Sequence, residues 1–183
     1  MNAPPLAIAV LVLGLLTPAW SAPASTVPMP DKGNTLIVPA ASPLHLHGFN
    51  KDGWAQFDGS LVISGTYYYG NDLYGEGEGG AATLTIFPDR ATRSLLPRFR
   101  RPVTDVGWVI ENADAFAAAV VPGDKLAILR KGGTLVVTGK IGIRVDHVTA
   151  WTACGNANFT ARFVAVTSPP RKFAAPALDA PDC

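Results

Sequence analysis

A chain of 183 residues is long enough to bury the core of one domain, and its formal net charge of +1 gives no bulk electrostatic attraction for nucleic acid or acidic lipid. Its low charge content, with 18 glycines and 16 prolines, indicates an ordered and strand-rich protein. We therefore expect a single domain of the mainly β class.

Residues 1–21 have the pattern of an export signal. Residues 6–16 form an apolar run that is too short to span a bilayer, and Pro18 follows it. The small residues Ala19 and Ser21 predict cleavage before Ala22. An uncleaved hydrophobic N-terminus is the alternative. No later stretch is apolar enough for a membrane helix, so we expect an exported protein, periplasmic or extracellular, without a membrane span after cleavage.

Residues 22–53 are predicted to be a linker with one short N-terminal strand. The segment 22–33 is rich in proline and small residues, and the strand candidate 36–38 ends at Pro39. The compact β-barrel domain is expected over residues 54–167, followed by a tail, 168–183, that contains four prolines.

Alternating apolar and polar residues predict two strands, at 57–69 and 82–87. The five glycines of residues 70–80 predict a flexible loop between them. An arginine-rich connection, 90–101, leads to a third strand at 106–110.

The segment 112–121 fits a helix or a strand. Its alanines and Asn112 favour a helix, and its paired valines fit a strand. Residues 124–132 predict a short helix, with Asp124 as the N-cap and Gly132 at the end.

The longest predicted strand is 134–154. Its odd positions are apolar as far as Val145, and then the apolar parity changes at His147 to Val148 and Ala150. Because side chains alternate between the faces of a strand, the change predicts a bulge or a break into two strands. A turn at 154–158 and a last strand at 159–166 follow.

The predicted fold is a small antiparallel barrel of five or six strands with one short helix before the long strand. The position of the helix between the third and fourth strands, and the run 126–139 (LAILRKGGTLVVTG), resemble small exported OB-fold-like domains of bacterial envelopes. The resemblance covers roughly residues 55–166, and many β proteins contain such a run. A jelly roll or an open sandwich is the alternative.

Aromatic residues beside the glycine-rich loop are the first candidate site. The resemblance implies an extended ligand on the outer face of the barrel, next to the loop after the first strand. We expect the ligand-binding residues to be Thr66, Tyr68, Tyr74 and Phe87. The alternative is that these aromatics serve packing alone, because strands are rich in tyrosine.

Arginines of the connection form a second candidate, an anion or partner patch of Arg93, Arg98, Arg100 and Arg101. A solvated loop with balanced charges is the favoured alternative.

Histidines are the third candidate. His45 and His47 would share one face of a strand, and with His147 they could supply the three ligands of a catalytic zinc ion. No pattern of supporting carboxylates accompanies them, so surface histidines are the favoured interpretation.

Two cysteines, Cys154 and Cys183, could pair in an oxidising compartment. The bond would close a loop of about 30 residues and stabilise the fold by roughly 3–4 kcal/mol in the chain-entropy model. The alternatives are two free thiols or a bond between two chains.

The sequence favours a non-enzymatic exported domain that binds an oligosaccharide, a peptide or an envelope protein, with no cofactor and no nucleic-acid partner. No nucleophile or metalloprotease motif is present. A small metal-dependent hydrolase using the three histidines and a purely structural envelope protein are the alternatives.

Overall fold

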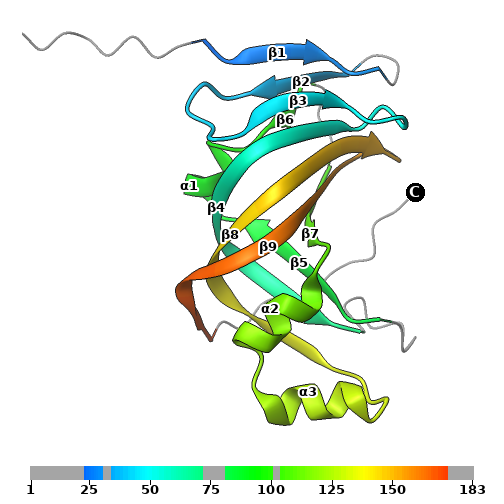
Figure 1. The fold of residues 1–183 in the computed structure, drawn as a ribbon, viewed down its shortest axis with the longest axis vertical. Coiled ribbons are helices and arrows are strands. Elements are labelled where there is room, and N and C mark those ends of the chain that lie inside the picture. The colour runs from blue at the N-terminus through cyan, green and yellow to red at the C-terminus, as the bar shows by residue number, and fades with distance from the viewer. Residues whose placement is uncertain (1–22, 31–33, 72–80, 101–103, 173–183) are drawn as a thin grey trace, which may run out of the picture.

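The computed structural model of the chain describes residues 23–30, 34–71, 81–100 and 104–172. Strands account for 57% of the described residues and helices for 15%, which confirms the predicted mainly β class. Figure 1 shows long curved strands wrapped around one interior, with a smaller sheet at one end and the helices labelled α2 and α3 at the other.

Five strands form a closed ring of hydrogen-bonded neighbours. In ring order they are β4 (Ala55–Gly70), β5 (Thr83–Pro88), β7 (Thr104–Ile110), β9 (Asn156–Arg171) and β8 (Val136–Ala153). The ring closes because β4 pairs with β8 along nearly its whole length as well as with β5. Neighbours are antiparallel except β7 and β9, which are parallel. A sixth strand, β3 (His45–Phe49), extends the sheet beyond β4.

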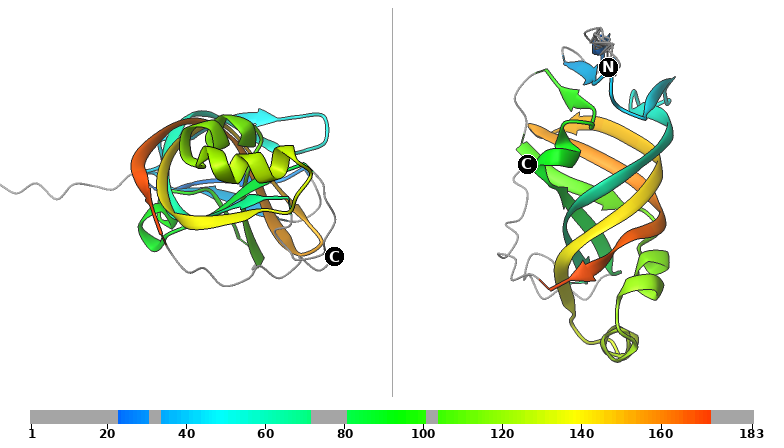
Figure 2. Two further views of the ribbon diagram at one scale, coloured as in Figure 1. Left: turned by 90° about the horizontal axis from the view of Figure 1, so that it is seen from below. Right: turned by 90° about the vertical axis from the view of Figure 1, so that its left-hand side faces the viewer.

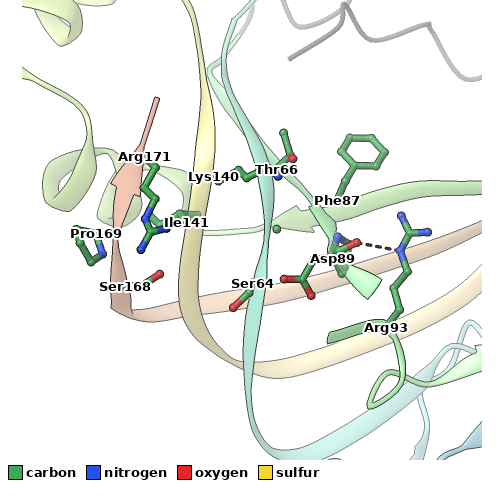
Figure 3. A pocket seen from close by; sticks show the side chains of 12 residues that line it. Ser64, Thr66, Phe87, Asp89, Arg93, Lys140, Ile141, Ser168, Pro169 and Arg171 are labelled. Atoms are coloured by element: carbon green, nitrogen blue, oxygen red, sulfur yellow. Dashed lines mark hydrogen bonds between the residues drawn. The ribbon is translucent and has the colours of Figure 1, made fainter. Parts of the chain in front are cut away.

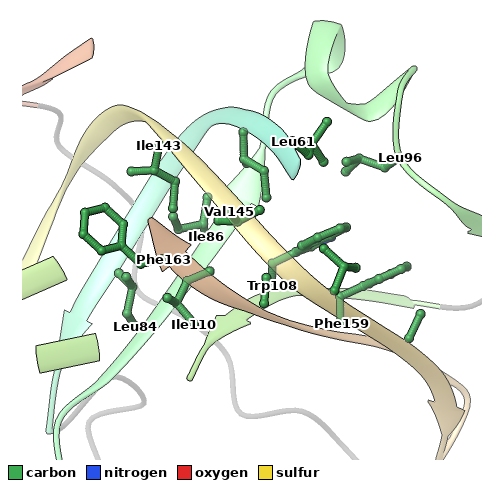
Figure 4. Close-up of a cluster of buried hydrophobic side chains, with 14 of the residues drawn as sticks. Leu61, Leu84, Ile86, Leu96, Trp108, Ile110, Ile143, Val145, Phe159 and Phe163 are labelled. Carbon is green, nitrogen blue, oxygen red and sulfur yellow. The ribbon is translucent and has the colours of Figure 1, made fainter. Parts of the chain in front are cut away.

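The predicted alternation places the core inside this ring (Figure 4). Buried apolar side chains point inward from each of the five strands, including Ile63, Ile86, Trp108, Ile143 and Phe163. Trp108 and Phe159 stack at a centroid distance of 4.7 Å across the parallel pair. The parity change in β8 is also confirmed. A register shift lies between Asp146 and Thr149, and from Val148 onward the buried residues are at even positions, Val148 and Ala150.

The N-terminal region is more structured than a linker, so the predicted boundary at residue 54 is wrong. β1 (Ser25–Pro28), β2 (Thr35–Val38) and β6 (Arg98–Phe99) form a three-stranded sheet. Leu36 is fully buried in the same core as the ring and faces Phe99 of β6. The second sheet forms because these apolar side chains cover one end of the ring. The segment 22–33 was misread because β1 is mostly exposed and carries no apolar alternation.

Two short helices, not one, precede the long strand. α2 (Ala113–Val120) and α3 (Gly123–Arg130) lie across the end of the ring opposite the second sheet (Figure 2, left). The ambiguous segment is helical because Phe116 and Ala117 then share a buried face. Asp124 lies within the first turn of α3, since Pro122 takes the N-cap position. Gly132, with φ of +73°, follows the end of α3 as predicted.

The last strand is longer than predicted at both ends. β9 continues through Pro169 and Pro170 to Arg171, which pairs with Lys140 of β8. The predicted tail therefore begins later than residue 168. The prolines predicted a tail because proline has no backbone N–H to donate to a strand ladder. Proline is nevertheless tolerated near the end of a strand or where the pairing is irregular. The register of β9 with β8 is irregular between Lys140 and Gly142.

Candidate functional site

A row of outward side chains crosses four neighbouring strands of the ring. Thr66 of β4 faces Phe87 of β5 on one side and Lys140 of β8 on the other, and Lys140 in turn faces Arg171 of β9. Thr66, Lys140 and Phe87 alternate with buried neighbours such as Tyr67 and Ile86, so they point away from the core. The register thus gathers an aromatic ring, a hydroxyl and two cations on one outer face.

These side chains line a pocket of about 490 Å³, here called the basic pocket (Figure 3). Its remaining polar lining comes from Ser64, Asp89, Arg93 and Ser168. Three cationic side chains face a single carboxylate, so the pocket carries an excess of positive charge. Arginine presents a planar fork of donors to a carboxylate or phosphate, and lysine adds a compact charge.

One wall of the basic pocket is held by the short helix α1 (Arg90–Arg93). Asp89 is its N-cap and accepts a hydrogen bond from the Thr92 amide at 2.8 Å. The Thr92 hydroxyl bonds the backbone of Ser64 in both directions, accepting from the amide at 3.1 Å and donating to the carbonyl at 3.2 Å. Arg93 Nε donates to the carbonyl of Pro88 at 2.9 Å. These bonds fix the Arg93 side of the pocket against β4 and β5.

The structure places only some of the predicted ligand-binding residues as expected. Thr66 and Phe87 line the basic pocket. Tyr68 lies outside the inner core, but it is only 5% exposed and packs edge-on against Phe87 at 5.7 Å. Burial raises the pKa of the Tyr68 phenol above its usual value. The expectation that its ring is open for stacking is therefore wrong. Tyr74 lies outside the described residues.

The predicted arginine patch is divided between two places. Arg93 lines the basic pocket, whereas Arg98 belongs to β6 of the second sheet. Arg100 follows β6, where its amide donates to the carbonyl of Thr35. Arg101 lies outside the described residues. The connection does not act as one patch because its backbone is used to pair with β2.

The structure brings two of the three histidines together. His47 Nδ1 lies 2.9 Å from Asp58 Oδ2, and His147 Nδ1 lies 3.0 Å from Asp146 Oδ1. His47, Asp58 and His147 line one small pocket, whereas His45 is not among its lining residues. In the part of the chain that the structure describes, no three histidine, cysteine or acidic side chains are placed to hold a metal ion. The three-histidine site is thus not formed.

Cys154 is disulfide-bonded. Cys183, the other cysteine of the sequence, lies outside the described residues, so the pairing of these two stays a prediction.

Sequence reasoning missed Lys140, Ser168 and Arg171. Lys140 occupies an outward position of the predicted long strand, and this signal was available. Arg171 fell in the segment predicted to be a tail, so only the register of β9 could place it beside Lys140.

Comparisons with models of protein families, with curated proteins and with solved structures give no significant match for this chain. Among the described residues, no helix has both the length and the apolar character needed to cross a membrane.

Proposed function

We propose that this chain is an exported, OB-type β domain that binds an acidic oligosaccharide in the basic pocket and does not catalyse a reaction on it. The main observation behind this proposal is the row of outward side chains across four strands, Phe87, Thr66, Lys140 and Arg171. Arg93 lines the same pocket. The proposal of export rests on the signal pattern of residues 1–21.

The strand order supports the OB-type assignment. An OB-fold is a five-stranded Greek-key barrel, and the ring here has five strands with α2 and α3 between the third and fourth of them. Such barrels bind oligosaccharides or oligonucleotides on the outer side of their second and third strands. The basic pocket includes Phe87 and Pro88 of the second ring strand, β5. For an exported protein, saccharides are the more accessible of these two ligand classes.

The charges support an acidic ligand. Lys140 and Arg171 are direct partners in the β8–β9 ladder, where like charges facing each other are unfavourable. An anionic group of a ligand placed beside both side chains would interact favourably with the two positive charges. The ring of Phe87 offers an apolar surface to a sugar, and the hydroxyls of Thr66, Ser64 and Ser168 can donate to or accept from sugar hydroxyls.

Calorimetric titration of the chain from Ala22 onward with a galacturonate hexamer tests the proposal. We expect binding that weakens between 50 and 300 mM NaCl, because exposed charges are screened. Replacing Lys140 and Arg171 together with glutamine should weaken binding at least about tenfold, since each charged hydrogen bond contributes on the order of 1.5–3 kcal/mol.

In the matched control, Lys125 and Arg130 of α3 are replaced with glutamine. Both are exposed and lie outside the basic pocket. The affinity of this control should equal that of the wild type. Equal binding of the carboxyl-reduced, neutral hexamer would contradict the proposal. So would binding of hexaglutamate in place of the saccharide, which would indicate a peptide ligand, or the absence of binding to either.

A further inference from the structure

Three neighbouring strands are bulged at the same level of the sheet. The register of β3 on β4 shifts between Leu46 and Gly48, and that of β4 on β8 shifts between Phe57 and Ser60. The shift in β8 lies between Asp146 and Thr149. Bulges re-aim side chains and are frequent beside functional sites. The bulges leave His47 without a partner in the β3–β4 ladder, and Asp58, Gly59 and His147 without one in the β4–β8 ladder.

The backbone at this level adopts conformations that a regular strand avoids. Gly59 has φ of +102°, and a Cβ there would collide with the carbonyl oxygen of Pro43. His147 has φ of +50°, which is uncommon for a residue with a side chain. Unusual backbone conformations of this kind cluster at functional sites in proteins.

The bulged residues surround a pocket of about 200 Å³, here called the bulge pocket. Its lining side chains that reach the surface are polar: His47, Gln56, Asp58, His147 and Thr149. The other two lining residues, Phe57 and Val148, have their side chains buried in the core. The volume is below the roughly 300–1,000 Å³ of a typical small-molecule site, so it suits one ring of a longer ligand.

A stacked pair of indoles adjoins the bulge pocket. Trp54 and Trp151 stack at a centroid distance of 4.3 Å with an interplanar angle of 12°. Gln56 faces Thr149 across β4 and β8, and each tryptophan lies two residues further along the same outward face. Trp54 is 36% exposed, so the stacked pair leaves apolar ring surface open beside the polar lining.

We infer that the bulge pocket and the Trp54–Trp151 pair form a second binding site, which takes one pyranose ring of a neutral saccharide. A pyranose presents apolar C–H faces and many hydroxyls that both donate and accept hydrogen bonds. The indoles match the first property. Gln56, Thr149 and Asp58 supply donors and acceptors for the second.

The charges of the bulge pocket argue against an anion. The lining contains the carboxylate of Asp58 and no lysine or arginine. On the neighbouring strand β9, Arg162 donates two hydrogen bonds of 2.8 Å to the carboxylate of Asp146. The site therefore differs in chemistry from the basic pocket, and the inference does not rest on the proposed function.

Tryptophan resonances provide a direct test. The chain from Ala22 onward contains three tryptophans, and Trp108 is buried in the ring whereas the other two are at the proposed site. ¹⁵N-tryptophan-labelled protein would be titrated separately with cello-, malto-, manno- and N-acetylchito-hexaose. We expect at least one of them to shift the indole signals of Trp54 and Trp151 and to leave that of Trp108 in place. The affinity should not change between 50 and 500 mM NaCl, because the probe is uncharged.

Variants separate this site from a general surface effect. Trp54→Ala should weaken binding about tenfold through loss of an aromatic contact. Gln56→Ala, at an exposed position, tests the pocket itself and should also weaken binding. Val62→Ala changes another exposed outward position of β4 and should leave the affinity unchanged. The Lys140 and Arg171 double variant should also bind the neutral probe normally, even if the proposed acidic ligand does not exist.

The inference would be overturned if none of the four hexaoses shifted the two indole signals, or if Gln56→Ala and Trp54→Ala bound as tightly as the wild type. Zinc chloride is added as a separate probe. Zinc-induced shifts of residues at this pocket that disappear in His47→Ala would identify a metal site in its place.

Discussion

Replacing Phe116 with alanine tests whether α2 is an essential part of the core. Phe116 is completely buried and touches three aromatic rings, Tyr67, Tyr69 and Phe163, at centroid distances of 5.3, 6.2 and 5.7 Å. It is the side chain through which α2 closes one end of the ring. Asn112 fixes the start of this helix to β9, where its amide donates to the Phe163 carbonyl at 2.9 Å and its oxygen accepts from the Phe163 amide at 2.7 Å.

The expected loss of unfolding free energy is about 4 kcal/mol. Burial of an aromatic side chain removes roughly 150–250 Å² from water, and measured phenylalanine-to-alanine changes in cores cost about 3–5 kcal/mol. The better helix propensity of alanine offsets only about 0.5 kcal/mol. For a domain of this size the melting temperature should fall by about 8–16 °C.

Urea unfolding followed by circular dichroism measures this change. Val164→Ala, on the outer face of β9 at 46% exposure, is the control and should change stability by less than about 0.5 kcal/mol. If Phe116→Ala lost less than about 1 kcal/mol, the helices would not contribute to the core and the closure of the ring at this end would be misassigned.

Two further predictions concern the outer face. Tyr68→Ala should destabilise the fold by about 2–4 kcal/mol in urea unfolding because the ring is buried against Phe87, whereas Tyr68→Phe should cost much less; a loss below about 0.5 kcal/mol for alanine would show that the ring is not packed. The hydrogen bonds from Arg162, with a smaller one from His147, lower the pKa of Asp146 to about 2. Since this folded-state pKa lies below the ordinary value, the carboxylate's contribution to stability is present above about pH 5 and is lost as pH falls from about 4 to about 2. The stability difference between wild type and Asp146→Asn should therefore shrink over that range, and a difference independent of pH would contradict the assignment.

Period-two patterns were sufficient to predict the faces of the long strands. Leu61 and Ile63 are buried as their alternation indicated, and the change of parity at His147 corresponds to a real bulge. These features are local, because burial of one face of a strand imposes its pattern on consecutive residues. The sequence does not decide between a helix and a strand for 112–121, because the helix depends on Phe116 meeting rings from β4 and β9.

Pairings between distant segments could not be predicted in the same way. β1 lacks a buried face, so only its ladder with β2 reveals it as a strand. The basic pocket depends on Lys140 facing Arg171, and the bulge pocket depends on β3, β4 and β8 being bulged side by side. Register is fixed by the whole set of strand pairings, and a single sequence shows each strand separately.

Curvature alone does not account for the bulge at His147. A closed ring needs bends, and glycine provides them without a penalty for a side chain; Gly59 serves in this way on the adjacent strand. At position 147 a glycine would adopt φ of +50° more easily than histidine. The observed contact of His147 with Asp146 is at a largely exposed imidazole, where an ion pair contributes little to stability. A histidine with positive φ is uncommon, and a ligand in the bulge pocket would use the imidazole where the bulge places it.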